Sequence, residues 1–461
     1  MPNAASRIPD LHAVSEAVTE RFPTIVAELA GLVRTPSVSW EAFDPEQVQA
    51  SAQQIAEAAQ ATEFFSSVEI HRAEISPGVL GQPAVLAHRP AQPGFPLIVL
   101  YAHHDVQPQG DPALWQSEPF EPTLRDERLY GRGTSDDKAG VVTHLNAIRI
   151  LHEQFGDDYP VGITLFVEGE EEAGSRSFEQ FLRDHRAKLA GDVIVVCDSD
   201  NVDTEQPALT VALRGNVTFR LGVRTLEHAN HSGMFGGVVP DAVMALIRLV
   251  NSCWDEHGSV VIPGLEHATL PGIPYDEAQL RHETGLIGEA IGSGSLTDRM
   301  WAQPTVTVTG IDVPNVAEAS NTLIPSVAAR LSVRVAPGQS PQAAWEAVER
   351  FLVANAPWGA QLSFDELDLG SPFLVDTSGP HYAAMSTALA EGWGVAPAEI
   401  GIGGSIPFIA SLAAEFPEAE ILVTAVGDPL SMPHSPNESQ HLGVLRKAIT
   451  SEALFLARLA E

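Results

Sequence analysis

Side chains of the kinds that bind divalent cations stand in several short polar motifs spread along this chain. They are His103, Asp105, Asp136, Glu171, Glu172, Asp200 and His434. Imidazole and carboxylate groups suit zinc and its neighbours. Five such ligands, with one carboxylate shared, are enough to hold two ions about 3.5–4 Å apart. The set therefore predicts hydrolysis that depends on two metal ions.

The residue types also suggest how the chemistry is divided within this set. His103 and Asp105 lie on the same side of an extended segment, so the carboxylate can orient a metal-binding imidazole. Asp136 offers two carboxylate oxygens and can bridge two cations, which no single histidine can do. Glu171 and Glu172 are adjacent and point apart, so one can bind metal while the other takes a proton from water.

Each motif also has an ordinary structural explanation. A polar loop after a strand explains His103 and Asp105. Asp136 opens a helix, where carboxylates serve as caps and are favoured by the helix dipole. The Glu171–Glu172 pair can be a solvated turn in a chain with 60 acidic residues. The metal-site interpretation therefore depends on the motifs occurring together.

The elements that must position these residues follow from short apolar, β-branched runs. The runs predict strands buried on both faces, as in a parallel sheet covered by helices, at 96–101, 161–167, 192–197 and 421–426. Helical patterns separate them at 46–61, 139–155, 176–188, 380–392 and 440–459. The fold class is therefore α/β with a mostly parallel sheet. Loops at the carboxyl ends of such strands converge on one crevice, where the candidate residues are expected to meet.

A second pattern begins near residue 209. Alternating strands at 209–213, 217–223, 305–309 and 329–335 combine with helices near 241–253 and 341–354, and 256–303 is expected to be a long loop. This pattern predicts a smaller α+β domain at 209–372. It is inserted into a catalytic domain made of 1–208 and 373–461.

Length and composition narrow the class of protein. A chain of 461 residues exceeds the roughly 250–300 at which a single core stops growing, which favours two domains. A net charge of −34 repels nucleic acid and acidic membrane surfaces, so we expect neither as a partner. No apolar run approaches the ~18 residues of a membrane span, and the N-terminus lacks the apolar core of a signal peptide. The expected location is the cytoplasm.

Several motifs together resemble the co-catalytic zinc aminoacylase and carboxypeptidase family of metallopeptidases. They are Tyr-Ala-His-His-Asp-Val-Gln-Pro (101–108), Gly-Arg-Gly-Thr-Ser-Asp-Asp-Lys-Ala-Gly (131–140), Glu-Gly-Glu-Glu-Glu-Ala-Gly-Ser (168–175), Cys-Asp-Ser-Asp-Asn (197–201) and His-Ser-Gly-Met-Phe-Gly-Gly (231–237). The chain looks most like the cytosolic dipeptidase, or carnosinase-like, branch. The resemblance spans nearly the whole chain and implies that the inserted domain is a lid that also forms a homodimer.

The resemblance assigns the metal site residue by residue. It implies that His103 and Asp200 hold one ion, that Glu172 and His434 hold the other, and that Asp136 bridges them. Glu171 is then the general base and Asp105 the orienting carboxylate. The ions are expected to be zinc, with manganese and cobalt as alternatives. In similar enzymes the peptide bond that corresponds to Asp136-Asp137 is cis.

The resemblance also assigns residues that contact the substrate. His231 matches a histidine that reaches the partner's active site and stabilises the oxyanion, with a turn-capping histidine as the alternative. Arg334 matches the residue that binds the substrate's carboxylate, a task for which the planar guanidinium group is well suited. The alternative is that Arg334 forms salt bridges on the outer face of its strand. Further contacts are expected from Gly404, Ser405 and Thr322.

These inferences predict a broad-specificity dipeptidase in which Glu171 removes a proton from the attacking water. Closure of the inserted domain over the sheet domain is expected to gate turnover. One alternative is an N-acyl amino acid deacylase or desuccinylase, which needs the same metals and a pocket for an acyl chain. The other is a non-catalytic binding module that kept the fold and lost the chemistry.

Overall fold

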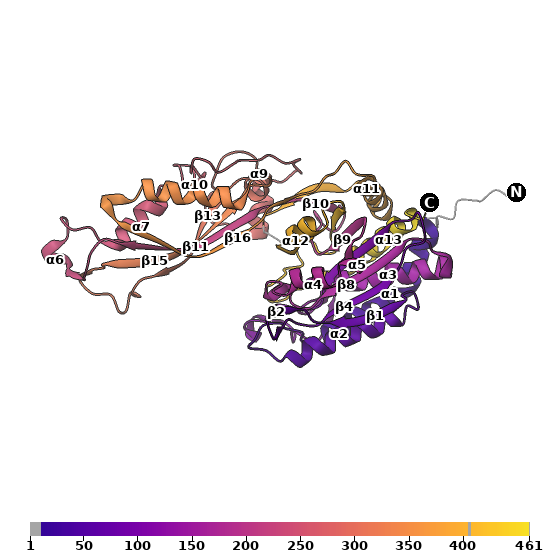
Figure 1. The fold of residues 1–461 in the computed structure, drawn as a ribbon. Coiled ribbons are helices and arrows are strands. Elements are labelled where there is room, and N and C mark those ends of the chain that lie inside the picture. Colours follow the sequence, from indigo (N-terminus) through magenta and orange to yellow (C-terminus); the bar gives the residue numbers. More distant parts are fainter. Residues whose placement is uncertain (1–10, 404–406, 461) are drawn as a thin grey trace. The chain divides into compact units, whose positions relative to one another are not determined.

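The computed structural model describes residues 11–403 and 407–460. The chain forms two compact units (Figure 1). The first unit comprises Met1–Val211, Val375–Glu399 and Ser411–Glu461, and the second comprises Ala212–Leu374 and Ile400–Ala410. The inserted domain was predicted at 209–372. The segment Ile400–Ala410, predicted to be catalytic-domain chain, is part of the second unit.

The largest sheet of the described chain is mixed. Its order is β1-β4-β8-β5-β9-β19-β10-β17, and β18 pairs with β10. These strands are β1 (Ser67–His71), β4 (Ala84–Arg89), β5 (Leu97–His103), β8 (Gly162–Glu168), β9 (Val193–Cys197), β10 (Ala208–Leu213), β17 (Phe373–Leu374), β18 (Ala398–Ile402) and β19 (Glu420–Thr424).

The four predicted strands form the parallel centre of this sheet. β5 pairs in parallel with both β8 and β9, and β9 pairs in parallel with β19. The antiparallel strands β1 and β4 extend one side of the sheet, and neither was predicted from the sequence. β10 was predicted to be the first strand of the inserted domain, but it pairs antiparallel with β19 in the large sheet. Smaller pairings join β2 (Glu74–Ser76) with β3 (Val79–Leu80), and β20 (Ser439–His441) with β7 (Arg128–Tyr130) and β6 (Thr123–Arg125).

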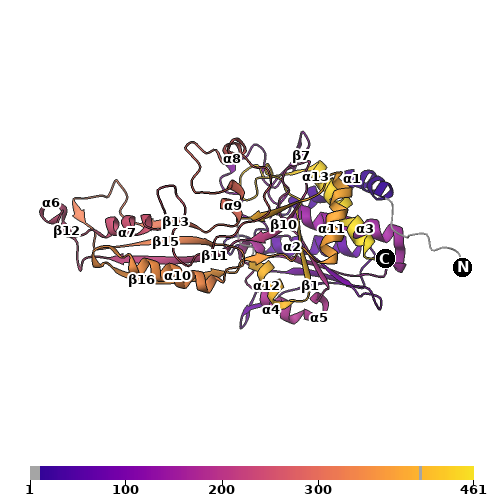
Figure 2. The same ribbon diagram turned by 90° about the horizontal axis from the view of Figure 1, so that it is seen from above.

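Helices cover both faces of the parallel centre (Figure 2). They are α1 (Leu11–Val33), α2 (Pro45–Gln60), α3 (Lys138–Phe155), α4 (Phe178–Asp184), α5 (Arg186–Leu189), α11 (Pro380–Trp393), α12 (Pro407–Glu415) and α13 (Leu442–Arg458). On the α4 side, Phe166 of β8 stacks on Phe181 with ring centroids 4.7 Å apart. On the other side, α3 packs between β5 and α13. Within the described residues, no helix combines the length and the apolar character that crossing a bilayer requires.

The second unit is a four-stranded sheet with helices on one face. The order is β13 (Thr305–Asp312), β15 (Ser326–Val335), β11 (Gly215–Arg224) and β16 (Gln361–Gly370). Alternate residues of β11, such as Phe219 and Leu221, share a core with α7 (Ala242–Asn251) and α10 (Pro341–Ala354). The remaining elements are β12 (Asn230–His231), β14 (Thr322–Leu323), α6 (Ser232–Phe235), α8 (Glu277–Thr284) and α9 (Leu296–Trp301). The last two are short helices within the stretch expected to be a loop.

A histidine of α3 forms a buried ion pair behind the sheet. The Nδ1 atom of His144 lies 2.8 Å from Oε1 of Glu452 on α13, and its Nε2 lies 2.9 Å from the carbonyl oxygen of Tyr101. Burial lowers the pKa of His144, but the charge and hydrogen bond of Glu452 outweigh burial and raise it above the ordinary value. Because the folded-state pKa is the higher one, this contribution to stability is complete below about pH 6.5 and is lost as pH rises through the folded-state pKa.

We expect His144→Leu to lower the unfolding free energy at pH 6 by about 3–5 kcal/mol, because it leaves Glu452 buried without its cation. The loss should shrink as pH rises from about 6.5 through the raised folded-state pKa of His144, because the stability that the protonated imidazole contributes is lost over that interval. Urea unfolding of metal-stripped protein between pH 6 and 9 measures both effects. His257→Leu, at an exposed histidine, is the control and should change stability by less than about 0.5 kcal/mol. A loss that does not vary with pH in this range would contradict the assignment.

Candidate metal centre

The candidate residues gather at the carboxyl end of the parallel strands. His103 is the last residue of β5, and Glu171 and Glu172 lie just beyond β8 in a short turn of 3₁₀ helix (Glu171–Ala173). Asp198 directly follows β9, and His434 lies in the loop between β19 and β20. This is the edge at which open α/β sheets bind their ligands.

Two groups of ligand-type side chains form there. One contains His103, Asp137 and Asp198, and the other contains Asp136, Glu172 and His434. Within each group the candidate ligand atoms all lie within 4.8 Å of one another. Tertiary folding therefore brings together His103, Asp136, Glu172 and His434 from motifs that are far apart in the sequence.

Asp136 stands between the two histidines. Its Oδ1 lies 3.1 Å from Nε2 of His103, and its Oδ2 lies 3.0 Å from Nε2 of His434. Burial alone would raise the pKa of Asp136, but the hydrogen bonds to the two histidines outweigh burial and hold it below its usual range. Each oxygen thus faces a different imidazole, which is the arrangement that a carboxylate bridging two cations requires. The peptide bond between Asp136 and Asp137 is cis.

Asp105 organises the turn that carries the two glutamates. Its carboxylate accepts hydrogen bonds from the backbone N–H of Glu171 at 3.1 Å, from that of Glu172 at 3.0 Å and from the Ser39 hydroxyl at 2.6 Å. Its Oδ1 also lies 3.4 Å from Nδ1 of His103, whose nearer neighbour is the Asp105 carbonyl oxygen at 3.1 Å. Asp105 therefore fixes both an imidazole and the pair of candidate acids.

The two adjacent glutamates differ in what holds them. Gln107 donates to the Glu172 carboxylate from its backbone N–H at 3.1 Å and from its side-chain amide at 2.7 Å. Oε2 of Glu172, which accepts from the Gln107 side-chain amide, also lies 3.3 Å from Nε2 of His434. Burial, and next the charge of Asp136, raises the pKa of Glu172 to about 7. Burial also raises the pKa of Glu171 well above its ordinary value, which favours holding a proton between accepting it and returning it.

The geometry places Asp198, not Asp200, beside His103. Oδ2 of Asp198 lies 3.8 Å from Nε2 of His103. Asp200 instead pairs through its backbone with Gly427 and lies outside both ligand groups. The sequence could not separate the two aspartates, because residues two apart in extended chain point to the same side. Burial raises the pKa of Asp198 to about 6, and burial together with the charge of Asp428 raises that of Asp200 to about 7.

Asp137 has a ligand-type carboxylate but already serves as a helix cap. Its oxygens accept hydrogen bonds from the backbone N–H of Gly140 at 3.2 Å and from that of His103 at 3.2 Å. It begins α3 and ties that helix to the end of β5. The capping role that the sequence analysis left open for this motif is therefore filled by Asp137, while Asp136 faces the histidines.

Glu438 is a buried acid that the sequence analysis missed. Its carboxylate accepts hydrogen bonds from Nη1 of Arg132 at 2.7 Å and from the backbone N–H groups of Gly133, Ser135 and Asp136 at 3.0, 3.0 and 3.1 Å. It thereby holds the loop that presents Asp136. In the sequence, Glu438 stands four residues after the predicted ligand His434.

The donor set fits a pair of divalent cations. Carboxylates of Asp136, Glu172 and Asp198 crowd around two imidazoles, and burial makes their ionised forms costly. Cations at the two groups would neutralise that charge and satisfy nitrogen and oxygen ligands of the types that zinc accepts. The residues present therefore match the predicted kind of centre.

The remaining predicted residues belong to the second unit. His231 caps α6 through Nδ1, which accepts from the backbone N–H of Gly233 at 3.1 Å, so the capping alternative is observed. Thr322 lies opposite His231 in the β12–β14 pair. Arg334 on β15 lies near Arg214, and burial, followed by this like charge, lowers the pKa of Arg214 to about 10. Gly404 and Ser405 lie outside the described residues.

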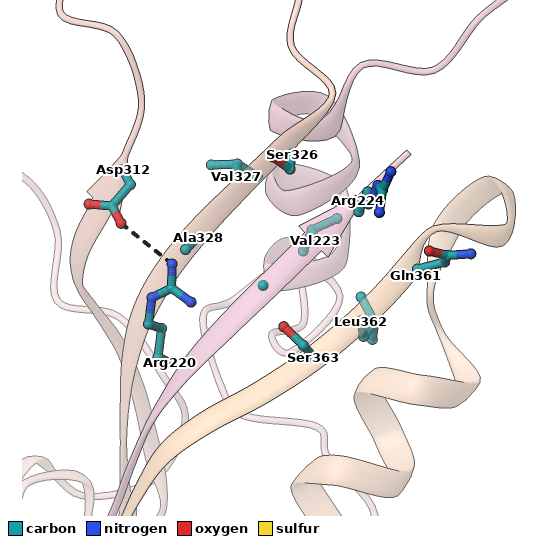
Figure 3. Close-up of a pocket in the computed structure, with 11 residues that line it drawn as sticks. Arg220, Val223, Arg224, Asp312, Ser326, Val327, Ala328, Gln361, Leu362 and Ser363 are labelled. Carbon is teal, nitrogen blue, oxygen red and sulfur yellow. Dashed lines mark ion pairs between the residues drawn. The ribbon is translucent and has the colours of Figure 1, made fainter. Parts of the chain in front are cut away.

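The second unit also has a hollow of about 470 Å³ on the sheet face turned away from its helices (Figure 3). Gly222 and Ala328 are among the residues that line it. Arg220 at its edge is within 3.9 Å of Asp312 and 3.6 Å of Asp365. Because this arginine already has acidic partners, and the described residues lining the hollow include none of the predicted site residues, we assign no chemistry to it.

Comparison with known proteins adds independent findings. Residues 99–458 match peptidase family M20/M25/M40. The cysteinylglycine-S-conjugate dipeptidase of Corynebacterium striatum is 36% identical over 368 residues, which cover 78% of this chain and 80% of that protein. The Beta-Ala-His dipeptidase of Rattus norvegicus is 28% identical over 376 residues, covering 77% and 75%.

A solved structure gives the same fold over nearly the full length. The di-peptidase Dug1p of Saccharomyces cerevisiae superposes with a TM-score of 0.79 at 22% identity, covering 99% of each chain. This likeness confirms the predicted fold class, an α/β sheet domain with a smaller α+β domain.

Proposed function

This chain belongs to the peptidase family M20/M25/M40, and from that premise we propose that it is a broad-specificity dipeptidase with two divalent cations and Glu171 as general base. Family membership confirms the resemblance predicted from the motifs. The dipeptide as substrate class is supported by the relatives, which are named as dipeptidases for cysteinylglycine S-conjugates and for Beta-Ala-His. We propose zinc as the metal, with manganese and cobalt as alternatives.

The observation that carries the proposal is the position of Asp136 between His103 and His434, one oxygen to each. We assign His103 and Asp198 to one cation, Glu172 and His434 to the other, and Asp136 to both. Asp198 replaces the Asp200 of the sequence-based assignment. Bound cations at these sites would polarise the scissile carbonyl and make water more acidic.

The chain's own residues then move the proton. The Glu171 carboxylate, fixed through its backbone by Asp105, accepts a proton from the attacking water. Its raised pKa lets it keep that proton and pass it to the leaving amine. Asp105 keeps His103 oriented, and Gln107 keeps Glu172 oriented, so the ligands need not reorganise during turnover.

The substrate contacts on the second unit remain proposals from the resemblance. Arg334 is proposed to bind the substrate's carboxylate, and Thr322, Gly404 and Ser405 to contact its backbone. His231 of a second copy is proposed to stabilise the oxyanion. We also propose that the protein works in the cytoplasm, which cell fractionation with an antibody to the chain would test.

We propose that the protein is a homodimer formed through the second unit. That unit exposes large apolar side chains around α6 and α7, among them Met234, Phe235, Val238, Met244 and Trp358, and Val238 is 88% exposed. Exposed apolar patches of this kind mark interaction surfaces. We expect wild type to run at twice its 49.2 kDa, and Val238→Asp combined with Met244→Asp to run as the monomer.

Light scattering coupled to gel filtration measures the two masses. Leu124→Asp, at an exposed leucine of the first unit, is the matched control and should leave the dimer intact. A wild-type protein of 49.2 kDa at micromolar concentration would refute the dimer.

The function is tested with a panel of free dipeptides and of N-acetylated and N-succinylated amino acids. Purified protein is assayed before and after chelation, and again with zinc, manganese or cobalt added back. We expect chelator-sensitive cleavage of free dipeptides that metal restores. Restored cleavage of only the N-acylated compounds would make the protein a deacylase, and inactivity with every metal would favour a binding module.

A further inference from the structure

A pocket of about 530 Å³ lies in the first unit, and one of its lining residues, Ala173, directly follows Glu172 of the candidate metal centre in the chain. Its apolar lining comes from Trp40, Ala42, Phe43, Pro108 and Ala173, and its charged lining is the ion pair of Glu41 and Arg176. Trp40 is 45% exposed although it is the largest of these side chains. The pocket therefore offers a large apolar surface that the protein itself does not cover.

Each wall of the pocket directly follows, in the chain, either a candidate metal ligand or a residue that hydrogen-bonds a carboxylate of the site. Ala173 follows Glu172, and Pro108 follows Gln107, whose amide holds the Glu172 carboxylate. Trp40 follows Ser39, whose hydroxyl donates to Asp105 at 2.6 Å. Consecutive Cα atoms are only 3.80 Å apart, so Ala173 starts one residue from a proposed metal ligand, and Trp40 and Pro108 each start one residue from a side chain that hydrogen-bonds a carboxylate of the site.

The segment that carries Trp40 and Phe43, the aromatic wall of the pocket, is fixed at both ends. Ser39 ties its beginning to Asp105, and the backbone N–H of Phe43 closes a turn onto the carbonyl oxygen of Trp40 at 2.9 Å. Asp44 then caps α2 by accepting from the backbone N–H of Glu46 at 3.0 Å. A preformed wall binds a ligand with little ordering cost, which is the usual property of a small-molecule site.

The charges at the pocket point to the kind of occupant. Arg176 lies 3.1 Å from Glu41 and 3.8 Å from Glu170, so its charge is already balanced. A carboxylate side chain would have to compete with Glu41 and Glu170 for this guanidinium. An apolar side chain does not have to displace these acids from Arg176, and it buries apolar surface against Trp40 and Phe43.

We propose that this pocket is a specificity subsite that receives a large apolar side chain of the dipeptide, next to the scissile bond. The proposal rests on the dipeptidase function and deepens it. It assigns to Trp40 and Phe43 the discrimination between large and small apolar side chains. Burying such a side chain favours it over alanine by about tenfold or more.

The first test compares kcat/KM for Leu-Gly and Phe-Gly with that for Ala-Gly, and for Gly-Leu and Gly-Phe with that for Gly-Ala. Wild type should prefer the large side chain at one of the two positions by about tenfold. Trp40→Ala, which removes the wall, and Ala42→Trp, which fills the pocket, should each bring that ratio close to one. Leu124→Ala, at an exposed leucine elsewhere on the first unit, is the control and should keep the wild-type ratio.

The second test measures binding without turnover. Isothermal titration of the preferred large dipeptide and its alanine analogue into chelated protein should show the same discrimination in wild type and its loss in Trp40→Ala. A flat ratio in wild type, or an unchanged ratio in both variants, overturns the subsite while leaving the dipeptidase function standing. Failure to hydrolyse any dipeptide, with the binding discrimination present, overturns the function and supports the subsite.

Discussion

Glu171→Gln is expected to bind both metal ions and to lose about 10²- to 10⁴-fold in kcat, the range that general acid–base catalysis contributes. The amide has nearly the same shape as the carboxylate but cannot accept the proton of the attacking water. The hydrogen bond from the Glu171 backbone to Asp105 does not involve the substituted atoms, so the turn should persist. Elemental analysis for two ions per chain and steady-state kinetics on a dipeptide measure the two parts of the prediction.

Glu170→Gln is the matched control for this variant. Glu170 is the neighbouring acid, but its carboxylate accepts from the backbone N–H of Ser177 at 2.7 Å and from that of Gln82 at 3.2 Å. It therefore supports the loop, and its substitution should lower thermal stability more than kcat. If Glu171→Gln keeps kcat within tenfold of wild type while binding two ions, Glu171 is not the base.

Asp198→Asn and Asp200→Asn are expected to differ sharply, although the two residues are only two positions apart. Asp198 faces His103 at 3.8 Å. Its loss should therefore lower the affinity for one of the two ions by more than the 10- to 100-fold that is typical of losing a residue that only hydrogen-bonds a ligand. Activity should fall by at least about 100-fold with it. Asp200→Asn should keep both ions, because its side chain belongs to neither ligand group.

Chelator competition measures the metal affinities of the two variants, and thermal unfolding provides a second readout. Burial and Asp428 raise the pKa of Asp200 to about 7, so its ionised form is disfavoured in the folded state. Stability is lost as pH rises above the unfolded value near 4, and Asp200→Asn should therefore be as stable as wild type or more so at pH 8. If Asp200→Asn loses an ion and Asp198→Asn does not, the assignment from the sequence is restored.

The parallel centre of the sheet could be predicted because its cause is local. A strand buried on both faces must be apolar at nearly every position, and β5, β8, β9 and β19 carry that pattern within single runs of residues. The antiparallel strands β1 and β4 also carry polar residues, because β1 at the edge of the sheet is only partly buried and β4 ends in the partly buried His88 and Arg89. Their place in the sheet depends on partner strands elsewhere in the chain, so it cannot be predicted from a short stretch of sequence.

The candidate site divides in the same way. Residue types alone identified His103, Asp136, Glu172 and His434, because few side chains can bind a cation and these stand just beyond predicted strands. Asp105 was also foreseen, since its spacing from His103 is a local property. The backbone hydrogen bonds that make Asp105 an organiser of the Glu171 turn were not foreseen, because they join two loops 66 and 67 residues apart.

The sequence by itself therefore determined the chemistry available to this protein, namely two imidazoles, a bridging acid, a base and the strands that end beside them. The tertiary structure alone decided which aspartate faces His103, that Glu438 holds the loop of Asp136 from more than 300 residues away, and that Trp40 lines one pocket with Pro108 and Ala173. The physical reason is that side-chain type and periodicity are properties of neighbouring residues. Distances between side chains are set only when remote segments bury their surfaces against each other and satisfy each other's hydrogen bonds.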